Sequence, residues 1–329
     1  MVDGFGRTID YLRISVTDKC NLRCKYCMPK HGVKLIPHEE LLTLEEIYRV
    51  VCIMESLGIK KVRFTGGEPL VRKNLIKLIR DVRALPGIEE IAMTTNGVLF
   101  GEWAERLRKA GLTSANISLD TLDKERFQAI TGVDAKDKVL EAIRKAREQD
   151  IKVKINCVPC REFNEEDIPK LAALAMWNEV DVRYIELMPI GCGRAFHGIP
   201  SDEILTRLEG VYGKAAPVKT GCGGSGPARY YEFENFQGKV GFISPMSHKF
   251  CRECNRVRLT AEGRLKLCLH YDTGIELKPF LRGGYSDEII REEILSAVNG
   301  KPEAHDFEQE LQNSGVAHSD SRRMVQIGG

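Results

Sequence analysis

Three cysteines near the start of the chain have a spacing suited to an iron-sulfur cluster. Cys20, Cys24 and Cys27 stand as C-x3-C-x2-C in the segment KCNLRCKYCMP. Three thiolates on one short loop can bind three irons of a cubane 4Fe-4S cluster and leave the fourth iron open to a small molecule. A zinc knuckle or a set of buried free thiols is the alternative, although zinc loops usually pair cysteines as C-x2-C with a second pair nearby. An open iron indicates chemistry rather than electron storage.

A second group of three cysteines lies toward the other end of the chain. Cys251, Cys254 and Cys268 form C-x2-C-x13-C, again with no obvious fourth thiol. A second 4Fe-4S cluster with a free iron fits this pattern. A zinc site that adds His248 or His270 to the three cysteines remains open.

Basic residues inside apolar strand-like runs predict a cavity for a polyanion. Parallel strands covered by helices are apolar on both faces, so a charge within them must face a lumen that holds a counter-charge. For any one such residue, a side chain that snorkels from an edge strand is the alternative. Guanidinium groups match phosphate oxygens, so together these residues suit a triphosphate. They are Arg13, Arg63, Lys154 and Arg183, to which the NRVR segment adds Arg256 and Arg258 on the same side of a strand.

These residues fall on a repeating pattern of strands and helices. The expected strands are residues 11–16, 61–65, 90–95, 114–119, 152–158 and 182–187. Thr43 and Glu46 predict a capping box at the start of the first helix, and Gly58 marks its end. Alternating strands and helices require a parallel sheet with right-handed crossovers, and six such units can curl into a partial barrel.

Polar and glycine residues follow several of the expected strands. In the GGEP segment at 66–69, two glycines allow close approach of the backbone to a ligand, and the Glu68 carboxylate can accept a hydrogen bond from an ammonium group. Ligands of open α/β folds and barrels collect where parallel strands end. Helix N-caps are the alternative for the residues at the ends of strands three and four. Those residues are Thr94, Asn96, Ser118 and Asp120.

Composition is that of an enzyme of a reducing compartment. The chain has 329 residues, a net charge of +2 and 11 cysteines, an odd number that argues against a disulfide framework. There is no N-terminal apolar segment of a signal peptide and no run of roughly 20 apolar residues, so we expect a cytoplasmic protein without membrane or nucleic-acid partners. Glycine-rich loops and antiparallel-looking runs begin after Pro189. We therefore expect two regions, 1–189 and 190–329.

Eight segments occur in an order that resembles the GTP 3′,8-cyclase family of radical S-adenosylmethionine enzymes, which start molybdenum-cofactor biosynthesis. They are CNLRCKYCMP, FTGGEPL, MTTNG, NISLDTL, YIELMPI, GPARYY, FCRECNRVRLTAEGRLKLCL and the final QIGG. The resemblance implies an α/β fold, a partial (β/α)6 TIM-like radical SAM barrel. A smaller C-terminal region with antiparallel strands and a second iron-sulfur site would close this barrel.

The resemblance also implies a reaction and its cofactors. In the family, two 4Fe-4S clusters and S-adenosylmethionine serve a radical cyclisation in which C3′ of GTP is joined to C8 of guanine. GTP would be the substrate, and an electron donor and a downstream cyclic pyranopterin monophosphate synthase would be partners. Whether the chain forms a homodimer is left open.

By motif position, the family's roles fall on particular residues of this chain. Cys20, Cys24 and Cys27 would bind the first cluster, and Cys251, Cys254 and Cys268 the second. The S-adenosylmethionine positions are Tyr26, Gly67, Ser118 and Met188. The GTP positions are Arg13, Arg63, Thr94, Lys154, Arg256, Val257 and Arg258, of which Arg13, Arg256 and Arg258 would be catalytic.

Composition and the family resemblance give different predictions for the C-terminal tail. From composition alone, the polar stretch 300–321 predicts a frayed end, whereas the resemblance implies that Gly328 and Gly329 reach into the active site, with Arg323 nearby. The stretch from His305 to Met324 is unlike the family's usual tail.

Five further cysteines are not assigned to a cluster. We expect each of them to be either a small buried hydrophobic residue or an exposed thiol. They are Cys52, Cys157, Cys160, Cys192 and Cys222.

Two other classes of function compete with the cyclase. One is a radical enzyme that modifies a peptide, and such enzymes typically have more cysteines in the C-terminal region than the three with cluster spacing here. The other is an iron-sulfur or zinc protein that binds a nucleotide without turnover, which would not need an iron that lacks a ligand.

Overall fold

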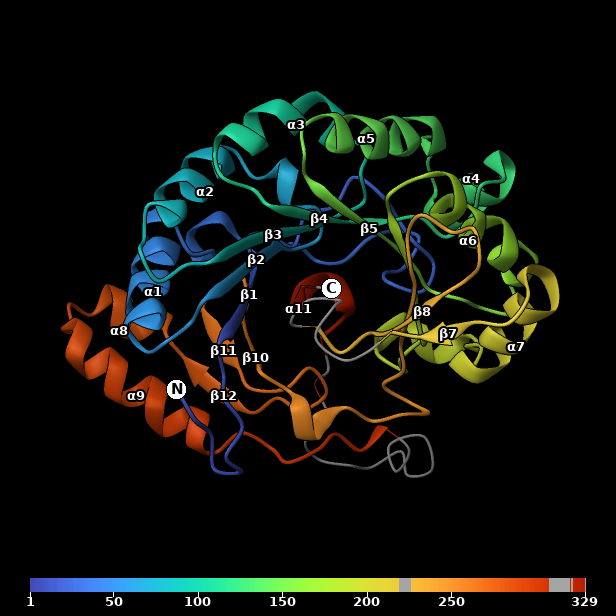
Figure 1. The fold of residues 1–329 in the computed structure, drawn as a ribbon. Helices are drawn as coiled ribbons and strands as arrows, with labels where there is room; N and C mark the ends of the chain where they lie inside the picture. The colour runs from blue at the N-terminus through green and yellow to red at the C-terminus, as the bar shows by residue number, and fades with distance from the viewer. Residues whose placement is uncertain (219–225, 308–319, 321, 329) are drawn as a thin grey trace.

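One curved sheet of twelve strands surrounds the centre of the molecule (Figure 1). The computed structural model describes residues 1–218, 226–307, 320 and 322–328. Six parallel strands form the middle of the sheet, at the positions that the sequence predicts: β1 (Tyr11–Ser15), β2 (Lys61–Thr65), β3 (Glu90–Thr95), β4 (Ser114–Ser118), β5 (Lys152–Cys157) and β6 (Asp181–Ile185). The prediction of six strand-helix units is therefore confirmed.

Later strands extend this sheet at both edges. Strands β10 (Arg256–Leu259), β11 (Arg264–Lys266) and β12 (Gly274–Glu276) follow β1, while β9 (Val240–Ile243), β8 (Arg229–Glu232) and β7 (Ala216–Pro217) follow β6. The outer pairs are antiparallel as expected, but β10 joins β1 and β9 joins β6 in parallel. The sheet thus continues from the first predicted region into the second, and the boundary after residue 189 stays a prediction.

Helices cover the convex side of the sheet (Figure 1). They are α1 (Leu44–Ser56), α2 (Leu75–Arg83), α3 (Phe100–Lys109), α4 (Lys124–Thr131), α5 (Lys136–Glu148), α6 (Ile168–Trp177), α7 (Ser201–Tyr212), α8 (Lys278–Arg282) and α9 (Asp287–Asn299). Short 3-10 turns lie in the connecting loops: η1 (His38–Glu40), η2 (Pro69–Val71), η3 (Glu165–Asp167), η4 (Gly191–Ala195) and η5 (Cys251–Glu253). The last helix, α11 (Met324–Ile327), lies instead inside the curve of the sheet.

The start of α1 shows the local signals at work. Thr43 accepts from the Glu46 N–H at 3.1 Å, and the Glu46 carboxylate accepts from the Thr43 N–H at 2.7 Å, which completes the predicted capping box. Gly58 follows the helix with a φ of 94°, a conformation that suits glycine at a helix end.

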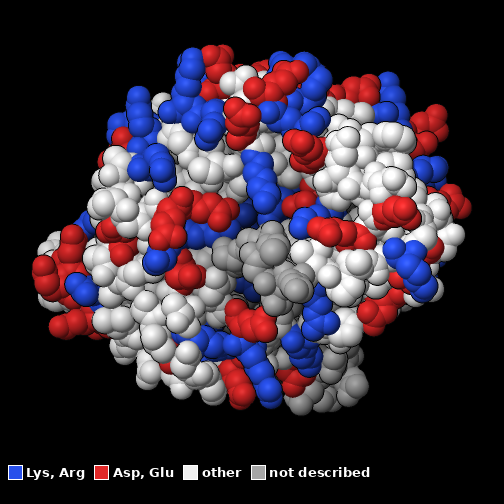
Figure 2. Space-filling view, in the orientation of Figure 1, with Lys and Arg blue, Asp and Glu red and all other residues white. Residues whose placement is uncertain are grey.

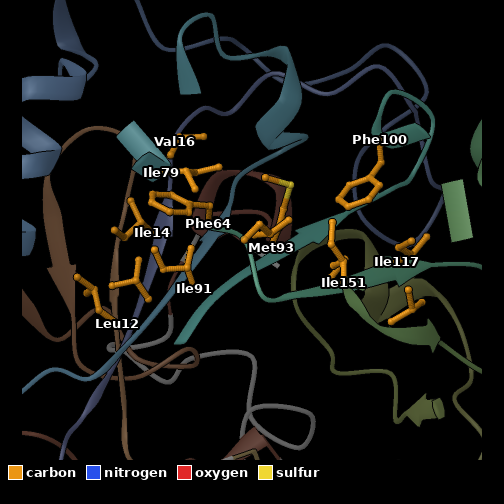
Figure 3. Close-up of a cluster of buried hydrophobic side chains, with 14 of the residues drawn as sticks. Leu12, Ile14, Val16, Phe64, Ile79, Ile91, Met93, Phe100, Ile117 and Ile151 are labelled. Carbon is orange, nitrogen blue, oxygen red and sulfur yellow. The ribbon is translucent and has the colours of Figure 1, made fainter. Parts of the chain in front are cut away.

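The hydrophobic core lies between the sheet and its outer helices. Leu12, Ile14 and Phe64 are fully buried and pack with Ile79 of α2 (Figure 3). Side chains alternate along a strand, so Tyr11 and Arg13 of β1 face the opposite, concave side. This alternation assigns apolar residues to the core and basic residues to the lumen.

Across the part of the chain that the structure describes, none of the helices has the length and apolar character needed to cross a membrane.

Candidate active site

Both cysteine groups and the strand cations line one cavity on the concave side of the sheet. Its walls include Cys20, Cys24, Cys27, Cys251, Cys254 and Cys268. They also include Arg13, Arg63, Lys154, Arg183, Arg256 and Arg258, so the prediction that these cations share a cavity is confirmed. In the view of Figure 2, which looks into the curve of the sheet, Lys and Arg side chains lie near the centre with Asp and Glu side chains among them.

The first cysteine group lies on the loop that follows β1. The backbone turns back on itself there, because the N–H groups of Cys27 and Met28 both donate to the Cys24 carbonyl, at 2.9 and 3.0 Å. The Cys20 sulfur accepts from the Leu22 N–H at 3.4 Å and from the Asn96 side chain at 3.7 Å. These contacts hold the loop so that its three thiols face the cavity.

The donor chemistry of this loop fits an iron-sulfur cluster. Burial and the neighbouring thiols raise the pKa of Cys24 well above its usual value, and burial with the charge of Cys20 raises that of Cys27 to about 12. Thiolates crowded in this way need a cationic partner. The irons of a cluster would supply it, and Cys20, Cys24 and Cys27 would be the ligands.

The second cysteine group brackets the strand pair β10 and β11. Cys251 and Cys254 flank η5 just before β10, and Cys268 follows β11. Burial raises the pKa of Cys254, but Arg256 and Lys301 outweigh it and lower that pKa to about 7. A readily ionised thiol beside two cations is suited to metal ligation.

The two histidines of the alternative zinc site lie in different places. His248 hydrogen-bonds to Asp202 at 2.9 Å on the outside of the molecule, whereas His270 lines the cavity and packs on Phe307. Within residues 1–218, 226–307, 320 and 322–328, no three His, Cys, Asp or Glu side chains converge on a point that would hold a single metal ion. His248 is not among the residues that line the cavity with Cys251, Cys254 and Cys268.

The cations nearest the second cysteine group lie side by side on three strands. In the registers of β10, β1 and β2, Arg258 pairs with Arg13 and Arg13 pairs with Arg63. Arg63 donates to the Tyr11 hydroxyl and, at 3.2 Å, to the Met93 carbonyl. These contacts orient Arg63 toward its neighbours in the lumen.

Burial and mutual repulsion mark this basic cluster as a binding site for an anion. Burial and Arg258 hold the pKa of Arg13 well below its usual value, and burial with Arg256 lowers that of Arg258 to about 10. Across the lumen, burial and Arg183 lower the pKa of Lys154 to about 7. Negative charge in the cavity would oppose each of these shifts, because it favours the charged form of a cation.

The GGEP segment makes close contacts within the protein, and its contact with a ligand stays a prediction. A Cβ at Gly67 would overlap the Lys19 carbonyl oxygen, and the Gly67 N–H donates to the Thr17 carbonyl at 2.7 Å. The glycine therefore allows β2 to approach the loop of the first cysteine group, as well as lining the cavity. The close approach is to the protein's own backbone.

Glu68 is fully buried and accepts several hydrogen bonds from within the protein, while a contact with an ammonium group stays a prediction. Its carboxylate accepts from the Thr95 hydroxyl at 2.8 Å, the Asn96 N–H at 2.8 Å and the Leu70 N–H at 3.1 Å. Burial raises the pKa of Glu68 to about 7. Glu68 thus fixes the backbone after β3, which positions Asn96 against Cys20.

The other residues assigned to ligand binding lie around the same cavity, with one exception. Tyr26, Gly67, Thr94, Ser118 and Met188 all line it. The exception is Val257, whose side chain is fully buried in the hydrophobic core, so a contact with GTP would have to use its main chain.

Among the cavity residues that the sequence analysis missed, three polar ones lie on the inner strands. Asn116 lies between Thr94 and Lys154 in the sheet register, and neither its side-chain oxygen nor the Thr94 hydroxyl finds a hydrogen-bond partner among the described residues. Lys61 pairs with Glu90 at 2.5 Å. Asn156 accepts from Arg183 at 2.6 Å and so holds that cation. The inward-facing alternation of β2, β4 and β5 was the available signal for all three.

The C-terminal tail enters the cavity, as the resemblance implies. Met324 and Val325 line it, and the Val325 N–H hydrogen-bonds to the Cys27 thiol. The Gly328 carbonyl accepts from Arg258 at 2.9 Å, and Figure 1 shows α11 at the centre of the curved sheet. The frayed end that composition predicts for 300–321 falls mostly on residues 308–319 and 321, which lie outside the described residues, as does Gly329.

The unassigned cysteines divide into three kinds. Cys157 and Cys160 are fully buried, which confirms their prediction as small hydrophobic residues. Cys52 is half-buried on α1, and Cys192 lies near Arg323 of the tail, 4.0 Å from its guanidinium. Cys222 lies outside the described residues.

Comparison with known proteins matches both regions of the chain. Residues 14–175 match the Radical SAM superfamily, and residues 180–307 match the family described as Molybdenum Cofactor Synthesis C. A GTP 3′,8-cyclase of Clostridium perfringens is 49% identical over 329 residues, which is 100% of both chains. One from Syntrophomonas wolfei is 46% identical over 333 residues, again 100% of both. The chain belongs to the GTP 3′,8-cyclase family. The family is a branch of the radical S-adenosylmethionine enzymes, so its cofactors include a 4Fe-4S cluster and S-adenosylmethionine.

Solved structures support the fold of this cyclase-family chain. Streptococcus suis SuiB bound to S-adenosylmethionine has a TM-score of 0.60 over 89% of this chain and 68% of its own, at 16% identity. SuiB bound to its precursor peptide SuiA has a TM-score of 0.59. At this identity the likeness shows the radical SAM fold alone.

Proposed function

We propose that the chain converts GTP to 3′,8-cyclo-7,8-dihydro-GTP, the first step of molybdenum-cofactor biosynthesis. The observation that carries this proposal is the single cavity that holds both cysteine groups, with the basic cluster between them. Full-length identity of 49% to a GTP 3′,8-cyclase supports the substrate. We also propose the division into a barrel (1–189) and a C-terminal region (190–329), which the separate family matches at 14–175 and 180–307 support.

The residues would divide the work between the two ends of the cavity. Cys20, Cys24 and Cys27 would bind one cluster, with Tyr26, Gly67, Ser118 and Met188 around S-adenosylmethionine. When bound, this pair supplies the 5′-deoxyadenosyl radical that removes hydrogen from C3′ of the ribose. Cys251, Cys254 and Cys268 would bind the second cluster at the opposite end, where the guanine base belongs.

The chain's own contribution would be positioning and charge. Arg63, Lys154 and Arg183 are fixed by strand registers, so they can hold a triphosphate without rearrangement. Arg13, Arg256 and Arg258 lie near the second cysteine group and would contact the substrate directly. The unsatisfied oxygens of Thr94 and Asn116 lie between these groups and can accept from ribose hydroxyls.

Anaerobic turnover tests the proposal. The reconstituted protein is given dithionite and S-adenosylmethionine, and 5′-deoxyadenosine is quantified with GTP, with ATP and without nucleotide. We expect formation that depends on GTP. Formation indifferent to nucleotide would keep the radical chemistry but reject the substrate. None at all, with iron and sulfide present, would favour a binding protein.

The wider cellular setting is also a proposal. The chemistry requires an electron donor to reduce the first cluster and an enzyme that consumes the cyclic product, which in the pathway is cyclic pyranopterin monophosphate synthase. A cytoplasmic location and a homodimeric state would be compatible with this role.

A further inference from the structure

The C-terminal tail is tied to the sheet at both of its described ends by one pair of strands. At its start, the Lys266 ammonium of β11 donates to the Asp320 carboxylate. At its end, Arg258 of β10 donates to the Gly328 carbonyl at 2.9 Å. Lys266 and Arg258 are directly opposed in the antiparallel register, so their side chains project from the same face of the sheet.

The pairing at the start of the tail is buried and reinforced. The side chains of Lys266 and Asp320 are 0% and 3% exposed. The Asp320 N–H donates to the His270 carbonyl at 3.0 Å, and the Arg322 side chain donates to the Asp320 carboxylate at 2.9 Å. The Lys266 ammonium also donates to the Tyr271 carbonyl at 3.0 Å. Separating a pair buried to this extent would leave an unpaired charge in the protein interior, which is costly in free energy. The pair therefore keeps a fixed geometry.

Arg322 connects this pairing to the surrounding loops. Its guanidinium pairs with Glu262, in the turn between β10 and β11, at 3.1 Å and also with Asp272, which follows β11. The tail therefore begins in a network whose members all come from the β10–β11 pair and the loop that follows it.

The geometry of the tail follows from these two fixed ends. Because Lys266 and Arg258 are neighbours, a segment held by both must leave the sheet and return to it. The single helical turn of α11 makes the reversal, and Gly328 allows the return with a φ of 88° beside Ser15 and Thr65. The reversal brings Met324 and Val325 into the cavity.

We propose that Asp320, Lys266 and Arg322 are positioning residues that hold the C-terminal tail inside the active-site cavity. They act through Val325 at the first cysteine group and through Gly328 at Arg258, and do not contact the substrate. The consequence for turnover rests on the proposed function, whereas the consequence for the tail's position does not.

Hydrogen exchange on the cluster-loaded protein tests the position directly. In Asp320→Asn we expect the amides of residues 325–328 to exchange about tenfold faster, with exchange in α1 unchanged. The double variant Lys266→Met/Asp320→Asn is expected to be no worse than the single one, because both remove the same interaction. Arg322→Met, at a less buried residue, provides a milder test if Asp320→Asn does not fold.

A buried ion pair elsewhere gives the control. Asp167 is fully buried and pairs with Arg126 of α4 at 2.6 Å, outside the network of the β10–β11 pair. Asp167→Asn is expected to lower stability without changing exchange at 325–328.

Turnover separates the two levels of the proposal. In Asp320→Asn we expect kcat/KM for GTP to fall about tenfold with iron content unchanged. Unchanged exchange at 325–328 would overturn the positioning role, and faster exchange with unchanged GTP turnover would overturn its link to the reaction. Faster exchange in a protein whose wild type does not act on GTP would uphold the anchor and reject the proposed function.

Discussion

The cavity is basic because single residues interrupt otherwise apolar strands. Arg13, Lys154 and Arg183 could be predicted to face a lumen, since a charge within an apolar strand that is covered on both faces needs a counter-charge. The position of Asn116 in the lumen could not be predicted, because a neutral amide within a strand does not require a counter-charge. Its role depends on Thr94 and Lys154, which only strand pairing places beside it.

Removing one cation of the cavity should impair the reaction without disturbing the clusters. We expect Lys154→Ala or Arg256→Ala to lower the rate of cyclisation on the order of 100-fold, since each removes a charge-assisted contact to the substrate. The measurement is product formation with iron and sulfide content determined in parallel. Lys152→Ala, at an exposed lysine of the same strand, is the control. Unchanged turnover by either variant would remove that residue from the site.

The titration of Lys154 gives a pH dependence. Burial and Arg183 lower its pKa from 10.5 to about 7, so the unfolded chain retains this proton to higher pH than the folded chain does. The cost of burying the charged amine is therefore full below pH 7 and is relieved as pH rises toward 10.5. The negative charge of a bound triphosphate favours the charged form of Lys154, so that this side chain takes up its proton again.

We accordingly expect GTP binding above pH 7 to take up protons and to weaken as pH rises. Calorimetry in buffers of different ionisation enthalpy measures the uptake. The variant Lys154→Met should lose the corresponding part of it. Equal uptake by this variant and the wild type would assign the protons to another group.

Tyr11 provides a second pH dependence, in which the ionised form is an anion that neighbouring cations stabilise. Although burial raises its pKa, Arg63 and Arg13 outweigh this effect and lower it to about 8. The phenolate thus stabilises the fold most above the unfolded value of 10.0, and this contribution is lost as pH falls through about 8. We expect near-ultraviolet difference absorbance to show one tyrosine ionising near pH 8, and Tyr11→Phe to abolish that step.

At the scale of elements, the six inner strands were predictable and their outer neighbours were not. Apolar runs that alternate with capped helices fix β1 to β6 from local sequence. The pairing of β10 with β1 and of β9 with β6 joins segments far apart in the chain, which no local pattern specifies. Likewise, no local pattern specifies the burial of the Glu68 side chain, because its partners Thr95 and Asn96 lie at the end of β3, a separate element.

The contact between β2 and the first cysteine loop should be intolerant of a side chain. We expect Gly67→Ala to lower stability by about 1–3 kcal/mol and to reduce iron loading, because the new methyl group would push against the Lys19 backbone. Thermal unfolding and iron content measure both effects. Gly210→Ala, in α7 with open space around it, should instead be neutral or stabilising by about 0.5–1 kcal/mol. A Gly67→Ala protein with normal iron content would show that the loop can adapt.

At the scale of the whole molecule, the two cysteine groups are brought together by one sheet. Cys20 follows β1, and Cys254 precedes β10, which is the strand beside β1. Two distant sequence motifs thereby line a common cavity. The sequence could indicate each motif, but only closure of the sheet by its latest strands shows that they belong to one site.

The pairing of β1 with β10 also has a consequence for how the protein is made. Tyr11 leaves the ribosome early, whereas its partner Arg256 is added only after most of the chain has been synthesised. During that interval the outer edge of β1 has no strand to pair with, and unpaired edges are prone to association. We therefore expect this long-range pairing to form late in folding. The same delay keeps the first cysteine loop accessible from that side while the rest of the chain emerges.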